Sequence, residues 1–137
     1  MQRMSDRTFL DSNILLYLLA SDSSKADAAE KLVASNPVIS VQVLNEICNV
    51  ALKKLNMPWA AIDEFVTLIR ALCRVEPLTT ETNLQARRLS QRYQLSFYDA
   101  CIVASALLAK CEILYSEDLH SGIKIEGSLT VVNPFLS

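Results

Sequence analysis

The chain has 137 residues, of which 51% are hydrophobic and 20% are charged, with a formal net charge of −2. This is the length of one ordinary domain, and so large an apolar fraction excludes an intrinsically disordered chain. A protein that holds nucleic acid by its overall charge is usually basic, so any nucleic-acid role must depend on a local site or on a partner's surface.

The first half of the chain predicts two short strands and four helices. Residues 7–10 form an apolar strand candidate, and Asp11, Ser12 and Asn13 are good N-cap residues before the apolar stretch 14–19. A second helix fits 24–35, and 38–40 is a buried strand candidate. A 3.6-residue apolar repeat predicts a helix over 41–55, and Pro58 at a favoured first position opens another through Leu72.

The second half continues the alternation of strands and helices. Residues 74–78 are extended, 80–93 form a helix capped by Thr79 or Thr80, and 96–110 form an apolar helix. A strand at 112–116 leads into a turn at 117–119, and a last strand at 129–132 stops at Asn133-Pro134. Short apolar strands between longer helices predict an α/β fold with a mostly parallel sheet, with one domain covering residues 1–137.

Several classes of protein and site have little support. The longest apolar run, 14–20, is too short to span a bilayer, and no signal-peptide cleavage site follows it. Cysteines at 48, 73, 101 and 111 lack C-x-x-C spacing, and His120 is the single histidine. Two glycines are too few for a phosphate-binding loop. We expect a soluble cytoplasmic protein with four core thiols, whose polar catalytic candidates are carboxylates.

Four of the fifteen acidic residues stand out by their context. Asp11 and Asp118 follow predicted strands, at the edge where open parallel sheets bind ligands. Asp99 lies in the first turn of an apolar helix, and Glu46 borders the buried stripe of another, where a carboxylate needs a partner. Each also has a structural interpretation: Asp11 as an N-cap, Asp99 in a capping box with Ser96, Asp118 as a turn cap, and Glu46 as a half-exposed helix residue.

The four acids lie in four short segments that occur in a characteristic order: 9–13 (FLDSN), 44–47 (LNEI), 97–100 (FYDA) and 115–118 (YSED). Over nearly its whole length the sequence resembles the PIN-domain ribonucleases and, among them, the VapC-type toxins of toxin–antitoxin pairs. This resemblance implies a three-layer α/β/α fold with the acids at one sheet edge. It implies that Asp11, Glu46, Asp99 and Asp118 are the catalytic residues and hold Mg²⁺ or Mn²⁺, supported by Asn13 and Ser116.

The same resemblance implies an endoribonuclease that hydrolyses RNA phosphodiesters, forms a homodimer and is inhibited by an antitoxin protein. Phosphate contacts could come from Arg87, Arg88 and Arg92 on one helix, or from Lys53 and Lys54, although a solvated surface explains these residues as well. The helix at 58–72 carries more apolar residues than one core-facing stripe needs, so it belongs either to the core or to a partner surface.

Two other functions stay open. A PIN-like fold that has lost catalysis would serve as a binding or assembly module, and the presence of all four acids weighs against it. A phosphatase or phospho-acceptor would use Asp11 as nucleophile or acceptor. The phosphatase needs a second Asp where Asn13 stands, and the phospho-acceptor needs a lysine after a late strand, whereas Lys110 precedes the strand at 112.

Overall fold

A six-stranded sheet runs through the centre of the computed structural model, which describes residues 7–20 and 23–136. The strand order is β3-β2-β1-β4-β6-β5, and all pairs are parallel except β5 with β6. The strands are β1 (Thr8–Leu10), β2 (Val38–Ser40), β3 (Arg74–Glu76), β4 (Ile113–Tyr115), β5 (Lys124–Ile125) and β6 (Leu129–Val132). The predicted mostly parallel α/β sheet is therefore confirmed.

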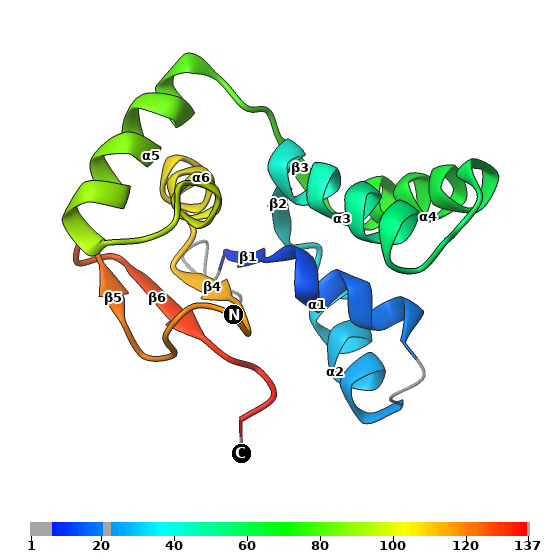
Figure 1. Cartoon of the computed structure of the whole chain (residues 1–137). Helices are drawn as coiled ribbons and strands as arrows, with labels where there is room; N and C mark the ends of the chain where they lie inside the picture. Colours follow the sequence, from blue (N-terminus) through cyan, green and yellow to red (C-terminus); the bar gives the residue numbers. More distant parts are fainter. Residues whose placement is uncertain (1–6, 21–22, 137) are drawn as a thin grey trace.

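Helices cover both faces of this sheet, which confirms the three-layer arrangement (Figure 1). The helices α5 and α6 lie together on one face, and α1 to α4 lie on the other (Figure 1). Their bounds are α1 (Ser12–Leu16), η1 (Tyr17–Leu19, a 3₁₀ turn), α2 (Ser23–Val33), α3 (Val41–Lys53), α4 (Trp59–Leu72), α5 (Thr80–Tyr93) and α6 (Phe97–Leu108). Among the described helices, none has the length and apolarity that crossing a bilayer requires.

Buried residues from both helical layers and from the sheet make up the core, and α6 is its most buried helix. Phe9, Leu114 and Val131, one from each of three neighbouring strands, are fully buried. Every residue of α6 from 100 to 106 is buried, because α6 contacts α3, α5 and β2. A helix that is apolar on all sides is typical of such an interior position. Three of the four cysteines are core thiols as expected, but Cys48 is only half-buried.

Parallel pairing determines which residues meet at the carboxyl edge. In the register of β1 and β4, Leu10 pairs with Tyr115, so the next residue of each strand, Asp11 and Ser116, emerge side by side. The backbone continues this pairing one step further, since Asp11 N donates to Tyr115 O at 3.0 Å. Ser116 N donates in turn to Val132 O of β6 at 3.0 Å.

The structure differs from the predicted elements mainly at their ends and in β5. The helix expected over 24–35 ends at Val33, and Asn36 then adopts a left-handed φ of 57°. The two-residue strand β5 was not predicted, because two residues are too few to show an alternating pattern. It forms a hairpin with β6 whose turn contains Gly127 at φ 70°, a conformation that glycine adopts without strain.

The start of α5 provides a test of local helix stabilisation. Thr79 is the N-cap of a capping box, in which Thr82 N donates to Thr79 Oγ1 at 3.2 Å and Thr79 N donates to Thr82 Oγ1 at 3.1 Å. We expect Thr79→Ala to lower the free energy of unfolding by about 1 kcal/mol in urea denaturation. The control is Thr80→Ala, which changes the exposed next residue without removing the cap. Equal stability of the two variants would contradict this role of Thr79.

Candidate functional site

The carboxylate of Asp11 is buried at the carboxyl edge of the sheet, and only 3% of the residue is exposed. It is the N-cap of α1, as one interpretation of the sequence predicted: Oδ1 accepts a hydrogen bond from Ser12 N at 2.7 Å. Its second oxygen is not used by the helix. Oδ2 accepts a hydrogen bond from Ser116 Oγ at 2.8 Å. Asp11 thus joins the ends of two neighbouring parallel strands.

Burial raises the pKa of Asp11 to about 6, from an ordinary value of 3.8. The hydrogen bonds from Ser116 and Ser12 oppose this rise, while the nearby charges of Glu46 and Asp118 add to it. The loss of hydration is therefore the main cause, and repulsion between carboxylates is secondary. The buried environment of Asp11 therefore disfavours the ionised form of its carboxyl group.

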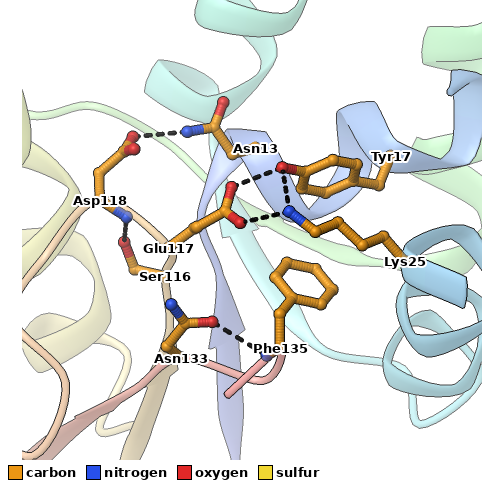
Figure 2. Close-up of polar contacts among 8 residues, drawn as sticks. All are labelled: Asn13, Tyr17, Lys25, Ser116, Glu117, Asp118, Asn133 and Phe135. Atoms are coloured by element: carbon orange, nitrogen blue, oxygen red, sulfur yellow. Dashed lines mark hydrogen bonds and ion pairs between the residues drawn. The ribbon is translucent and has the colours of Figure 1, made fainter. Parts of the chain in front are cut away.

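Ser116 organises the loop that carries Asp118. Its side chain is fully buried, and Oγ accepts hydrogen bonds from Asp118 N at 3.3 Å and from Leu119 N at 3.2 Å while donating to Asp11. Asn13 Nδ2 donates to Asp118 Oδ2 from the first turn of α1 (Figure 2). Ser116 thus contacts both Asp11 and Asp118, and Asn13 contacts Asp118. These are the two residues expected to support the acids.

Glu46 reaches the same edge from α3. Its Oε1 accepts a hydrogen bond from Ser12 Oγ at 2.8 Å, and its Oε2 accepts one from Gln42 Nε2 at 3.2 Å. Sequence reasoning assigned Ser12 only to the N-cap run and missed this contact. The signal was present, since Ser12 lies between two residues that were singled out, but its partner is 34 residues away.

Asp99 lies in the first turn of α6, where Ser96 is the N-cap. Ser96 Oγ accepts a hydrogen bond from Asp99 N at 3.2 Å, which is one half of the predicted capping box. The other half is absent, and the Asp99 carboxylate accepts no hydrogen bond from any residue that the structure describes. Burial is the main cause of the raised pKa of Asp118, and the nearby charge of Asp99 adds to it. The capping-box interpretation therefore does not account for this carboxylate.

Charge interactions thus connect each of the four acids with at least one other. Asp11 is influenced by Glu46 and Asp118, and Asp118 by Asp99. Within residues 7–20 and 23–136, however, no group of three His, Cys, Asp or Glu side chains is close enough to hold a metal ion.

A fifth acid at this edge, Glu117, is held by a set of contacts with Tyr17 and Lys25 that we call the Glu117 clamp (Figure 2). Tyr17 OH donates to Oε1 at 2.6 Å, and Lys25 Nζ donates to Oε2 at 2.9 Å. Lys25 Nζ also lies 4.7 Å from the centroid of the Tyr17 ring and 5.2 Å from that of Phe135. The hydrogen bonds from Tyr17 and Lys25 lower the pKa of Glu117, so it stays ionised and paired.

The predicted basic surface on α5 is exposed but largely paired within the chain. Arg88 and Arg92 form ion pairs with Glu126 at 3.0 and 3.4 Å, and Arg87 Nε donates to Asn83 Oδ1 at 3.0 Å. Glu126 was not predicted as a partner of these arginines, because no element was predicted for the segment just before β6. Phosphate contacts by these arginines would have to compete with the pairs already made.

The apolar helix α4 was expected to belong either to the core or to a partner surface, and its residues are in fact partly buried and partly exposed. Ile62, Phe65 and Ile69 are buried and belong to the core. Trp59 is 57% exposed and Leu68 is 50% exposed, so part of the helix surface remains apolar.

Comparison with solved structures shows several similar folds. A toxin–antitoxin complex from Klebsiella pneumoniae contains a chain with 21% identity and a TM-score of 0.70, covering 93% of this chain and 98% of that one. VapC20 of Mycobacterium tuberculosis, a toxin that cleaves the sarcin-ricin loop, has 23% identity and a TM-score of 0.66, covering 81% and 89%. FitAcB of Neisseria gonorrhoeae has 20% identity and a TM-score of 0.66, covering 93% and 98%.

At these identities the neighbours establish the fold alone, and no curated protein sequence gave a significant match. A family model provides the assignment. The PIN domain model matches residues 8–120, a span that contains all four candidate acids and both residues expected to support them. The chain therefore belongs to the PIN domain family.

Proposed function

We propose that this chain is a metal-dependent endoribonuclease that hydrolyses RNA phosphodiesters. The observation that carries the proposal is the buried Asp11 carboxylate, with its pKa raised to about 6 and with the charges of Glu46 and Asp118 close by. A protein that places carboxylates against one another bears an electrostatic cost that a bound cation would remove. Such clusters of perturbed acids are typical of functional sites.

The donor set suits a hard divalent cation. Asp11, Glu46, Asp99 and Asp118 offer only carboxylate oxygens, which Mg²⁺ and Mn²⁺ prefer over nitrogen and sulfur. When bound, such an ion polarises a phosphoryl oxygen and lowers the pKa of a water molecule. The serines at 12 and 116 hold Asp11 and Glu46 by hydrogen bonds, so these acids are already oriented before substrate arrives.

The proposed reaction is in-line attack of water on the phosphorus. The bond to the 3′ oxygen breaks, which leaves a 5′-phosphate and a 3′-hydroxyl. This chain has one histidine, His120, so it has no histidine pair to drive attack by the ribose 2′-hydroxyl.

We further propose that the protein is the toxin of a toxin–antitoxin pair, forms a homodimer and acts on RNA in the cytoplasm. The similarity of its fold to proteins from toxin–antitoxin complexes supports this proposal. The exposed apolar side chains of α4, Trp59 and Leu68, are available for a protein partner. Of the three arginines on α5, Arg87 makes no ion pair among the described residues and is the preferred candidate for a phosphate contact.

A binding module without catalysis is the second candidate. It is favoured by one observation, namely that no three acids in the described part of the chain are close enough to share an ion. The two candidates differ in a single measurement: cleavage of total RNA by the purified protein with Mg²⁺, with Mn²⁺ and with EDTA.

We expect Asp11→Asn and Asp99→Asn each to reduce RNA cleavage to background, because each removes a carboxylate from the proposed metal centre. Mapping the ends of the wild-type products should give 5′-phosphates. Asp63→Asn, which changes an exposed acid on α4, is the matched control and should cleave as the wild type does. Full activity in either of the first two variants would show that the acid is not needed for catalysis.

The raised pKa of Asp11 predicts how stability depends on pH in EDTA. Below about pH 4 the folded and unfolded chains both hold the proton, whereas between about pH 4 and 6 only the folded chain holds it. The contribution of Asp11 to the free energy of unfolding therefore falls by about 3 kcal/mol as pH rises through this interval.

Asp11→Asn lacks this proton but can still cap α1, since Asn is a good N-cap residue. We therefore expect the variant to be more stable than the wild type at pH 7.5, by up to about 3 kcal/mol, and equally stable near pH 4. The measurement is a series of urea denaturations in EDTA. Two stability curves that stay parallel across the range would contradict the raised pKa, and destabilisation by several kcal/mol would make Asp11 a structural residue.

A further inference from the structure

Two aromatic side chains lie exposed where α6 begins, directly before Asp99. Tyr98 is 65% exposed and Phe97 is 40% exposed, although the helix residues that follow, 100 to 106, are all buried. Their ring centroids are 6.2 Å apart, and the planes are tilted by 54°. Neither side chain belongs to the buried core or to the partly buried residues packed against it, so core packing does not explain two adjacent exposed aromatic groups here.

Helical geometry places Tyr98 on the face of α6 that lies between Cys101 and Asp99. Residues three apart share one face of a helix, so Tyr98 lies one turn before Cys101. Cys101 is near enough to Glu46 to be influenced by its charge, and Asp99 is similarly near Asp118. Tyr98 and Asp99 therefore flank the first turn of α6, one on the side of Glu46 and the other on the side of Asp118.

RNA binding at this site cannot rely on charge alone. The chain has a net charge of −2, the site itself is acidic, and both Arg88 and Arg92 are paired with Glu126. Proteins that bind single-stranded nucleic acid add a second source of affinity, the stacking of bases on aromatic side chains. Every base has a π-face, so one exposed tyrosine can serve for any sequence.

We propose that Tyr98, with Phe97 beside it, is a stacking subsite for one unpaired nucleobase adjacent to the phosphodiester that is cleaved at the acidic site. The inference rests on the proposed nuclease function and adds to it a residue that selects the form of the substrate. A base inside a duplex is covered by its neighbours and cannot stack on a protein ring. Cleavage is therefore restricted to nucleotides that are single-stranded or turned out of a helix.

The test compares Tyr98→Ala, Tyr98→Phe and Trp59→Ala. Trp59 is the matched control, since it is an aromatic residue of similar exposure, 57%, on the distant helix α4. In the Asp11→Asn background, which keeps the RNA intact, the binding of a fluorescently labelled single-stranded RNA is measured by anisotropy in the presence of Mg²⁺. We expect Tyr98→Ala to weaken binding about 5- to 150-fold, the range for the loss of one base–aromatic stack. Tyr98→Phe and Trp59→Ala should stay within about twofold, because each leaves an aromatic ring at position 98.

Two further readouts separate stacking from a general effect on the fold. In the otherwise wild-type protein, Tyr98→Ala should raise KM for single-stranded RNA and leave kcat largely unchanged, since the ring binds a base and not the reacting atoms. An RNA that lacks one base next to the cleavage site should lose binding to the wild type but lose nothing further with Tyr98→Ala, which is the coupling expected for two groups in contact. Thermal unfolding of each variant checks that it is folded.

The outcomes distinguish this inference from the proposed function. If the wild type cleaves RNA and Tyr98→Ala binds and cleaves equally well, the subsite is wrong and the nuclease stands. If the wild type cleaves nothing but binds single-stranded RNA through Tyr98, the subsite stands and catalysis is wrong. Equal loss of binding in Tyr98→Ala and Trp59→Ala, or no binding by the wild type, overturns the subsite.

Discussion

The hydrogen bond between Ser116 and the buried carboxylate of Asp11 joins the two central strands at the point where both end. It follows directly from the parallel register, in which Leu10 pairs with Tyr115 and the next residues emerge together. Asp11 could not be buried as a charged group without such donors, because the transfer of an unpaired carboxylate from water is prohibitively unfavourable. Ser12 then extends the connection to Glu46 on α3. The dipeptide Asp11-Ser12, between β1 and α1, is thus linked to the end of β4 through Ser116 and to α3 through Glu46.

Like charge is the second constraint on this edge, and the structure meets it with neutral polar side chains. Serine and asparagine side chains contact the aspartates, while the fifth acid is paired by a separate set of contacts. Glu117 is next to Asp118 in sequence, yet Tyr17 and Lys25 hold its carboxylate while Asn13 contacts that of Asp118 (Figure 2). The Glu117 clamp therefore keeps an additional negative charge paired while Asp118 remains in contact with Asn13.

The comparison of sequence with structure shows which signals are local. The helix α5 and the strand β6 have the predicted bounds, because a threonine cap, an apolar repeat and a terminal Asn-Pro lie within the elements or beside them. The four acids were found from short segments and their place after strands. Two of their partners, Asn13 and Ser116, were expected as well. The contacts of Ser12 with Glu46 and of Arg88 with Glu126 were not predicted, because only the folded chain brings these residues together. The strand β5 was missed since its two residues gain their conformation from β6.

The four acids accept different numbers of hydrogen bonds, and this difference indicates from which side a ligand would reach the site. Both oxygens of Asp11 and of Glu46 accept hydrogen bonds, while Asp118 accepts one and Asp99 accepts none from the described residues. Asp11 and Glu46 are thus fixed by the protein, whereas Asp99 and Asp118 keep lone pairs for a ligand. Asp11 is buried, Glu46 and Asp99 are partly exposed, and Asp118 is exposed. A ligand would therefore enter between the loop after β4, which carries Asp118, and the start of α6, which carries Asp99.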